Sequence, residues 1–421
     1  MSMPAGELVA LLATPMACHP AVRTAEARCV ELTPALLDAL DRAEYREPYD
    51  EATRVRVGLF GSGRQPIEVV LDCLTEAARQ GALREPTEAL LRLARDEHRG
   101  TRWSAGGVLG AIASDACVEG LRHILLDPDR SVAVPALRSL AHACEHGRAS
   151  SSVRSALFEV VAHRCFSERE HDLYPDATCL IALDRERAAR VLCEPPVMGL
   201  SNRGCSKVLK AMRESGVAAP VAALEGLIAQ HARLDAEAYC EACAISEALL
   251  MLATLDTSRV TPLVPELRAS PSQRVRRAAA QAACTAMGIT DPYARVERDE
   301  DEGNPTTEAH RIFALVRDVK DQVDNGGVSQ YFVNGFGREW SAAVDALGTI
   351  GAPRLASALR SAAMKMGSNG PDLGNYDAAV AGIHQRDDDP FDAEDKVFSA
   401  DEDDFEVRVW EFIAANPEDF R

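Results

Sequence analysis

The stretch from Asp324 to Asn334 reads DNGGVSQYFVN, and the C-terminal third of the chain is organised around it. Upstream, apolar residues between Ile312 and Val323 recur at the spacing of an amphipathic helix. Asn325-Gly326-Gly327 is expected to end that helix, because glycine readily adopts the positive φ angle that a chain leaving a helix commonly needs. Helical spacing resumes at Val328. The sequence therefore predicts two helices joined by a glycine turn.

Two amides follow the glycines. Gln330 and Asn334 lie one helical turn apart, and we expect their side chains to satisfy backbone groups that the turn leaves open. Between them, Tyr331 and Phe332 continue the apolar spacing. The glycine motif discussed below comprises Asn325, Gly326, Gly327, Gln330, Tyr331, Phe332 and Asn334.

Charge separates the two ends of the chain. The 421 residues carry a formal net charge of -19, and 47% of them are hydrophobic. Residues Asp291 to Arg421 include 28 acidic and 13 basic residues, a net charge of -15, so that residues 1–290 carry only -4. An acidic chain is a poor direct ligand for nucleic acid. The length indicates two or three domains, or one long repeat array.

Before residue 290 the sequence predicts closely spaced helices joined by short turns, which is typical of antiparallel helix pairs. Asp127-Pro128 precedes Val132 and an Ala- and Leu-rich helix, and Ser270-Pro271 precedes Val275 and a similar helix. A third, weaker copy places Trp103 at the position of these valines. The pattern resembles HEAT repeats. The resemblance implies an α-solenoid, in which each helix pair buries its apolar face against the next.

We therefore expect an all-α chain in four parts. These are an irregular helical segment at 1–50, a HEAT-like solenoid at 51–290, a polar linker at 291–305 and a small acidic helical domain at 306–421. In the first part, Thr33-Pro34 is expected to start a helix, because Thr caps helices and Pro is favoured at the first helical position.

The acidic domain resembles the DMP-nineteen family of bacterial DNA-mimic proteins. The resemblance rests on the glycine motif, on Ile350-Gly351-Ala352 before a helix of Leu and Ala, and on an acidic end with Phe405, Trp410 and Asn416. It covers about residues 306–421. It implies a small helical protein whose carboxylates imitate the phosphates of duplex DNA and occupy the DNA site of a regulator. Unlike the family pattern, this chain has a long solenoid before the module, which is a second candidate for choosing the partner.

The candidate partner-binding carboxylates lie in the tail from Asp387 to Asp419, which holds 14 acidic residues and 2 basic ones. Apolar residues interrupt this tail, so we expect it to pack down and display its carboxylates outward. DNA-binding proteins meet phosphates with rows of Lys and Arg, and carboxylates at similar density would meet the same cations. The candidates are Asp387, Asp388, Asp389, Asp392, Glu394, Asp395, Asp401, Glu402, Asp403, Asp404 and Glu406.

No pattern in the sequence predicts a catalytic residue, a cofactor site or a metal site. Cys240 and Cys243 form a single CxxC in a helical pattern without the second pair of a zinc site, and we expect two core or half-buried thiols. His142 and His146 are four residues apart but lack the Glu of a zinc protease motif. The run Gly58–Gly63 lacks the Lys-Ser/Thr end of a phosphate loop. We expect a non-enzymatic protein.

The twelve cysteines lie mostly in apolar helical patterns, as free buried thiols do. Residues 1–20 lack the basic start and long apolar run of a signal peptide, and no stretch is apolar enough for a membrane helix. We therefore expect a reducing, bacterial cytoplasm and no contact with a membrane.

These observations favour a binding protein that sequesters a basic partner, such as a transcription regulator or nuclease, with the solenoid as scaffold. The alternative is an immunity protein that neutralises a bacterial toxin through the same contact. A third hypothesis is a HEAT-type DNA-repair enzyme, which needs a basic concave face that the charge of residues 1–290 does not favour. The arginine clusters that support this third hypothesis are Arg274, Arg276 and Arg277, and Arg185, Arg187 and Arg190.

Overall fold

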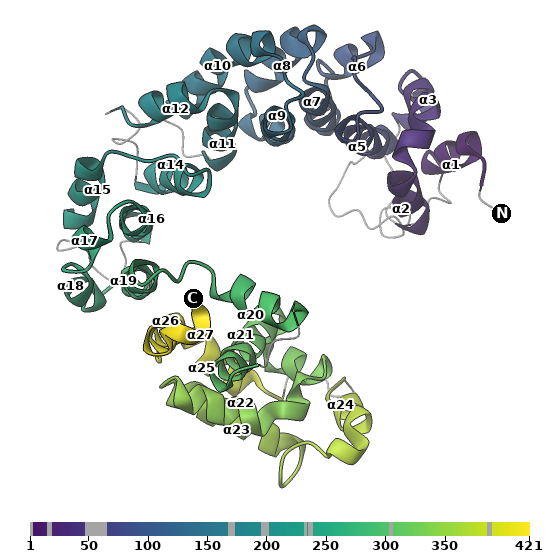
Figure 1. The fold of residues 1–421 in the computed structure, drawn as a ribbon. Helices are drawn as coiled ribbons and strands as arrows, with labels where there is room; N and C mark the ends of the chain where they lie inside the picture. The colour runs from purple at the N-terminus through teal and green to yellow at the C-terminus, as the bar shows by residue number, and fades with distance from the viewer. Residues whose placement is uncertain are drawn as a thin grey trace. The chain divides into compact units, whose positions relative to one another are not determined.

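The computed structural model describes residues 3–14, 19–46, 65–166, 173–194, 202–230, 234, 239–302, 306–384 and 390–421. Within these residues the chain forms α- and 3-10 helices and no strand longer than an isolated bridge, which confirms the all-α, solenoid-like fold class. It divides into two compact units, Met1–Ala223 and Leu224–Arg421, each described by itself (Figure 1). In the described ranges, no helix is both long and apolar enough to cross a membrane.

The N-terminal unit consists of short helices that follow one another closely. They are α1 (Ala5–Leu12), α2 (His19–Ala27), α3 (Cys29–Ala39), α5 (Pro66–Arg79), α6 (Glu88–Leu93), α7 (Arg99–Ile112), α8 (Val118–Leu125), α9 (Val134–Glu145), α10 (Ser151–Cys165), α11 (Tyr174–Leu183), α12 (Arg185–Leu192) and α14 (Asn202–Glu214), with α15 (Val221–Ile228) at the boundary. Short 3-10 turns lie at Ala43–Tyr45, Asp115–Cys117 and Arg130–Ala133.

A continuous row of helices forms one layer of this unit. In this row α5 packs on α7, α7 on α9, α9 on α11 and α11 on α14. Figure 1 shows α6, α8, α10 and α12 along the other side of the row, and α8 and α10 also contact each other. Each helix pair therefore buries its apolar face against the next pair, as the sequence predicts.

Small residues bring the helices of the row close together. A Cβ at Gly110 of α7 would lie 2.5 Å from the backbone oxygen of Ala136 in α9. At Gly106 a Cβ would lie 2.9 Å from the side chain of Ile124 in α8. Only glycine permits such a close approach of two helix backbones. The alanine- and glycine-rich composition of these helices therefore sets the spacing of the layer.

An arginine fastens successive helix pairs together. Arg102 in α7 donates through Nη1 to the backbone oxygens of Asp96 and Glu97, both at 2.9 Å. Its Nε donates to Oδ2 of Asp127 at 2.7 Å. Asp127 lies in the turn that leads to the next helix pair and is only 7% exposed. Arg102 thus joins the turn before its own helix α7 to the turn between α8 and α9, at the start of the next helix pair.

The C-terminal unit contains one long helix among shorter ones. Its elements are α16 (Tyr239–Leu255), α17 (Thr257–Val260), α18 (Val264–Arg268), α19 (Gln273–Ala286), α20 (Pro292–Asp301), α21 (Glu308–Val333), α22 (Trp340–Thr349), α23 (Pro353–Met366), α24 (Tyr376–His384), α25 (Asp392–Ala400), α26 (Phe405–Ala415) and α27 (Pro417–Phe420). Short 3-10 turns lie at Phe336–Glu339 and Leu373–Asn375.

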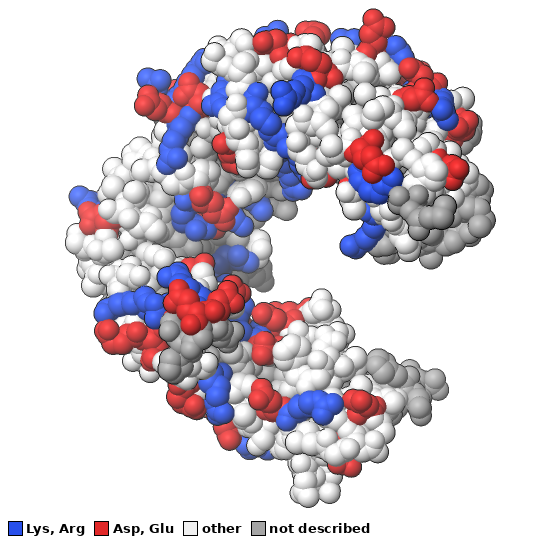
Figure 2. All heavy atoms as spheres, turned by 45° about the vertical axis from the view of Figure 1, so that its right-hand side comes forward, with Lys and Arg blue, Asp and Glu red and all other residues white. Residues whose placement is uncertain are grey.

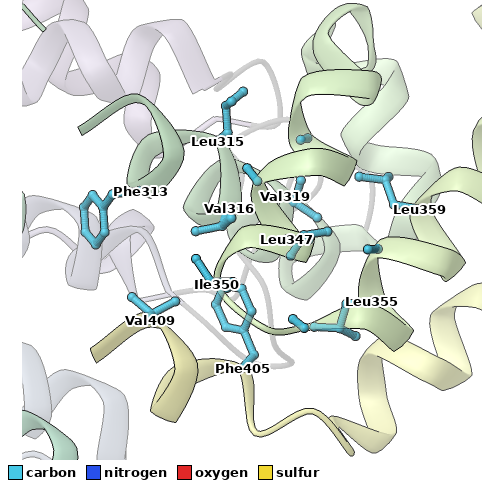
Figure 3. Close-up of a cluster of buried hydrophobic side chains, with 14 of the residues drawn as sticks. Phe313, Leu315, Val316, Val319, Leu347, Ile350, Leu355, Leu359, Phe405 and Val409 are labelled. Carbon is cyan, nitrogen blue, oxygen red and sulfur yellow. The ribbon is translucent and has the colours of Figure 1, made fainter. Parts of the chain in front are cut away.

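One apolar core runs through this unit from α19 to α27. Figure 3 shows side chains of α21, α22, α23 and α26 converging in it, among them Val316, Leu347 and Phe405. Cys284 of α19 and the following Ile289 belong to the same core. Since α19 packs on both α16 and α26, residues 224–290, which the sequence assigns to the solenoid, share a compact unit with the acidic domain.

The stretch 291–305, which the sequence predicts to be a linker, contains helix α20. Val296 is 7% exposed and belongs to the core of the unit. Tyr293 lies edge-on against Phe313 of α21, with ring centroids 4.9 Å apart. Val296 therefore anchors this highly charged segment in the core, and Tyr293, which is 38% exposed, covers Phe313 from outside. The high charge of the segment led the sequence analysis to predict a linker instead of a packed helix. Residues 303–305 of the predicted linker lie outside the described residues.

Candidate partner-binding surface

The glycine turn of the motif is a bend inside α21, as predicted. Gly326 and Gly327 have non-helical backbone angles, and Gly327 has a φ of 78°. A Cβ at Gly327 would lie 2.7 Å from the carboxylate of Asp395 in α25. Oδ1 of Asp395 accepts a hydrogen bond from the amide of Val328 at 2.6 Å, where the helix resumes. Asp395 therefore caps the second half of α21, and Gly327 provides both the backbone angle and the space.

The aromatic residues of the motif are part of the core. Tyr331 is 1% exposed and Phe332 is fully buried. The backbone oxygen of Phe332 accepts a hydrogen bond from the hydroxyl of Tyr376 at 2.7 Å. A Cβ at Gly337 would overlap the ring of Phe332. These residues hold α24 against α21, so the motif determines the architecture of the domain.

The amides of the motif do not cap the bend, in contrast to our expectation. Nδ2 of Asn334 donates to Oε1 of Gln322 at 2.6 Å, a contact that crosses the bend. Gln330 lies over Gly326, where a Cβ would be 3.0 Å from Oε1 of Gln330. The amide that opens the second helical half bonds to Asp395 instead. Local spacing could not show this, because the two residues are 67 positions apart.

Among the described candidate carboxylates, Glu394 is the most buried, with 5% exposed. It accepts hydrogen bonds from Oγ of Ser361 at 2.7 Å and from Nζ of Lys365 at 2.5 Å, both on α23. Burial alone would raise the pKa of Glu394, but Lys365 and Ser361 outweigh it, so that the pKa lies below its usual range. Glu394 therefore fastens α25 to α23.

Three of the four carboxylates in the turn between α25 and α26, those of Asp401, Asp403 and Asp404, bind groups of their own chain and are only partly exposed. Asp401 and Asp404 have positive φ angles of 43° and 53°, which Asp tolerates better than most residues. Oδ1 of Asp401 accepts a hydrogen bond from the amide of Phe405 at 2.9 Å. Oδ2 of Asp403 accepts from two amides in the first turn of α23, at 2.8 and 3.0 Å. These carboxylates cap the N-terminal ends of α26 and α23.

Asp404 binds an arginine of the preceding helix pair. Its two oxygens accept hydrogen bonds from Nε and Nη2 of Arg276 in α19, at 2.8 and 2.7 Å. Nη1 of Arg276 donates to the backbone oxygens of Ser270 and Pro271, at 2.8 and 3.0 Å. The bidentate pair is geometrically specific and charge-assisted. It joins the turn before α19 to the turn before α26, as Arg102 joins two turns in the N-terminal unit.

Further contacts hold the same acidic segment. Glu406 accepts a hydrogen bond from Nη1 of Arg317 in α21 at 2.8 Å and lies 3.4 Å from Nη2 of Arg277. Nε2 of Gln273 donates to Oδ2 of Asp401 at 2.6 Å. The segment from Asp401 to Glu406 is therefore bound by side chains of α19 and α21. Arg276 and Arg277, which the sequence associates with nucleic acid, contact carboxylates of their own chain.

Among the described candidates, Asp392 and Glu402 face solvent, with side chains 70% and 58% exposed. Asp392 pairs with Lys396 at 2.6 Å and Glu402 with Arg354. Asp387, Asp388 and Asp389 lie outside the described residues. On the face of the C-terminal unit that Figure 2 displays, acidic and basic side chains are interspersed. All eight described candidates have a partner within the chain, and their role in binding another protein stays a prediction.

Sequence reasoning missed a second set of carboxylates, on helices before the tail. Asp321 and Asp324 of α21 are 57% and 60% exposed and pair with Arg317 and Lys320, one turn earlier. Asp377 at the start of α24 is 97% exposed. The available signal was their position outside the apolar stripe of each helix, where a charge faces solvent.

The described residues contain no group of three or more His, Cys, Asp or Glu residues arranged to hold a metal ion. His142 and His146 stack with ring centroids 4.1 Å apart, and Nη2 of Arg148 lies 2.7 Å from Nδ1 of His142. Burial, together with His146 and Arg148, lowers the pKa of His142. The guanidinium of Arg148 therefore lies at the ring nitrogen of His142 to which a metal ion would bind. The glycine-rich run Gly58–Gly63 lies outside the described residues.

Comparison with known proteins identifies one domain. Residues 304–416 match the family described as DMP19-like protein, the DMP-nineteen family that the sequence resembles. A search of curated proteins finds no match. Among solved structures, a chain of the "Kap95:Nup1 complex" is similar at a TM-score of 0.36 and 13% sequence identity. The similarity covers 94% of this chain and 56% of that one, so this chain spans little more than half of its length.

Proposed function

We propose that this chain, in which residues 304–416 form a DMP19-like domain, is a non-enzymatic regulator that sequesters a basic protein. The partner would be a DNA-binding protein or a nuclease. The observation that carries the proposal is the net charge of -15 from Asp291 to Arg421, a region whose described residues are mostly helical and share one apolar core. A folded acidic surface attracts cationic partners and speeds their encounter at low salt.

The solvent-facing carboxylates are the ones we expect to meet the partner. The segment from Asp401 to Glu406 is held by its own chain, whereas Asp321, Asp324 and Asp377 are more than half exposed. Their pairs with neighbouring cations are surface ion pairs, which stabilise a fold by only about 0–1 kcal/mol. A partner's arginine would therefore replace such a cation at little cost.

The helix pair of α16 and α19 provides a scaffold for this surface. The pair of Arg276 and Asp404, and a core shared by α19 and α26, fix the domain to α19. A rigid base reduces the entropy that binding would otherwise cost. We therefore expect the whole chain to bind more tightly than a loosely tethered domain would.

Affinity capture from extracts of the native host tests the proposal. With the full chain as bait, we expect a basic protein to be retained at low salt, released as salt is raised, and displaced by duplex DNA. Retention of an apolar partner that is insensitive to both salt and DNA would contradict the proposal.

A pair of matched variants locates the contact. Asp321→Lys with Asp324→Lys reverses two exposed charges of the domain. The control, Asp38→Lys with Asp41→Lys, reverses two carboxylates of the N-terminal unit whose side chains are each 65% exposed and also paired with arginine. Both variants change the net charge equally. We expect the first to weaken binding of the captured protein by roughly tenfold or more and the second to change it little. Equal weakening by both would assign the attraction to overall charge.

A further inference from the structure

Helix α16 begins with two thiols that the proposed function does not use. Cys240 and Cys243 are the second and fifth residues of α16, and both are partly exposed. Among the described cysteines the only other partly exposed thiol is Cys193, and the rest are buried. A spacing of three residues places two side chains on the same face of a helix. The pair is therefore open to reagents that the buried thiols do not meet.

A fixed cation lies beside this pair. Arg274 of α19 lies over the ring of Tyr239, 4.6 Å from its centroid, and donates to its hydroxyl at 3.0 Å. Burial raises the pKa of Cys243, while Arg274 and Tyr239 act in the opposite direction. Arg274 is therefore the cation that favours a thiolate at Cys243, which distinguishes Cys243 as the attacking thiol and Cys240 as the second thiol.

The helix geometry permits a disulfide with some strain. Residues three apart in an α-helix have Cα atoms about 5 Å apart, within the range of roughly 4.4–6.8 Å for disulfides. Their Cβ atoms are about 5–6 Å apart, further than the roughly 3.5–4.5 Å of a relaxed bridge. The first turn of α16 must therefore tighten. Strained, accessible disulfides are the readily reduced ones, which suits a reversible modification rather than a structural bond.

We propose that Cys240 and Cys243 form a reversible disulfide when the protein meets a hydroperoxide. The thiolate of Cys243 attacks the peroxide, the O–O bond breaks, and sulfenic acid forms at Cys243 while the remaining oxygen leaves as water or alcohol after taking up a proton. The thiol of Cys240 then attacks that sulfur, and the hydroxyl leaves as water with the thiol proton. Two electrons pass from the thiols to the peroxide, and a small dithiol restores both thiols by exchange.

Peptide mass spectrometry of the full chain tests this step. Reduced protein is treated with hydrogen peroxide, and its remaining thiols are blocked with iodoacetamide before digestion. We expect the peptide that contains Cys240 and Cys243 to be unblocked, lighter by the mass of two hydrogen atoms, and restored by dithiothreitol. Blocked thiols at both positions, under conditions that oxidise Cys193, would overturn the proposal.

Single variants separate the two roles. Cys240→Ser is expected to stop at sulfenic acid on Cys243, which dimedone traps, whereas Cys243→Ser is expected to give neither product. Arg274→Gln should slow the disulfide several-fold with the helical circular dichroism unchanged, and Cys193→Ser should leave the rate unchanged. Dimedone labelling of Cys240 instead of Cys243 would contradict the assigned order.

Discussion

Arg102 in the N-terminal unit and Arg276 in the C-terminal unit make the same set of contacts in different surroundings. Each donates to the backbone oxygens six and five residues before it. Each also binds an aspartate in the turn that starts the next packed helix, Asp127 or Asp404. The first aspartate lies 25 residues further along the chain, in the next helix pair, and the second lies 128 residues further, in the DMP19-like domain.

This comparison shows that the DMP19-like domain takes the place of the next helix pair after α19. Helix α26 packs on α19 as α9 packs on α7. A helical stack exposes an apolar face at its last pair and needs a cap that is polar outside. The acidic segment from Asp401 to Glu406 forms part of such a cap, so its carboxylates have an architectural role that charge counting does not reveal.

The largest expected effects come from removing each arginine. Arg102→Ala leaves Asp127, only 7% exposed, without its cation, and we expect a loss of about 3 kcal/mol of local stability. Arg276→Ala leaves Asp404, whose side chain is 27% exposed, and we expect about 2 kcal/mol. Hydrogen exchange of amides in the first turns of α9 and α26 measures both. If hydrogen exchange in α26 is unchanged in Arg276→Ala, Arg276 does not have the stabilising role of Arg102.

Exchanging the charges of Arg276 and Asp404 tests whether the contact between α19 and α26 depends on this pair. Arg276→Asp and Asp404→Arg should each destabilise the contact between α19 and α26, and the double variant should recover about 1 kcal/mol of the combined loss. A double-mutant cycle by hydrogen exchange gives this coupling energy. Additive losses would show that the two side chains do not act on each other.

A variant of Glu394 tests the internal packing of the domain without changing its contact with α19, because Glu394 binds side chains of α23. Glu394→Gln should cost about 1 kcal/mol at neutral pH, because the charge-assisted bond from Lys365 is weakened. The pKa of Glu394 is lowered in the folded protein, so its contribution is present above the usual Glu range and is lost as pH falls through the lowered value. Unfolding of variant and wild type should converge in acid, and exchange in α19 should not change.

The smallest effect is expected at Asp401. Burial raises its pKa in spite of the amide of Phe405 and the side chain of Gln273. The folded protein therefore keeps this proton to higher pH than the unfolded chain, and stability falls as pH rises from the usual Asp range through the raised value. Asp401→Asn should gain less than about 1 kcal/mol at neutral pH and nothing in strong acid. A loss at neutral pH would show that the charge on Asp401 stabilises the turn.

Sequence patterns predicted what depends on near neighbours. The bend at Gly326-Gly327 and the helix of Leu and Ala after Ile350-Gly351-Ala352, which is α23, agree with expectation, since glycine freedom and proline at a helix start are local effects. Local reasoning was wrong at Thr33-Pro34, because α3 begins at Cys29 and contains both residues. The hydroxyl of Thr33 bonds to the backbone oxygen of Cys29 at 2.9 Å inside the helix, an alternative to capping that Thr has in any helix.

Contacts between distant residues could not be predicted. The repeat alignment that places Trp103 at the position of Val275 makes Arg102 equivalent to Arg274. In the structure, the residue that makes the same contacts as Arg102 is Arg276. The candidate carboxylates were chosen by charge clustering, yet what each does depends on helices up to 128 residues away. Clustering of acidic residues in a sequence does not distinguish helix caps and buried ion pairs from a surface that awaits a partner.

The elbow in α21 has a consequence for how this domain can vary. The two halves of that helix meet where a carboxylate from α25 accepts a hydrogen bond from the amide of Val328. A chain that stopped short of Asp395 would lose the latch of its longest helix and not merely a charged tail. Shortening the domain from its end should therefore let α21 flex at its midpoint. At least one acidic residue of the tail thus has a structural role that does not depend on a cationic partner.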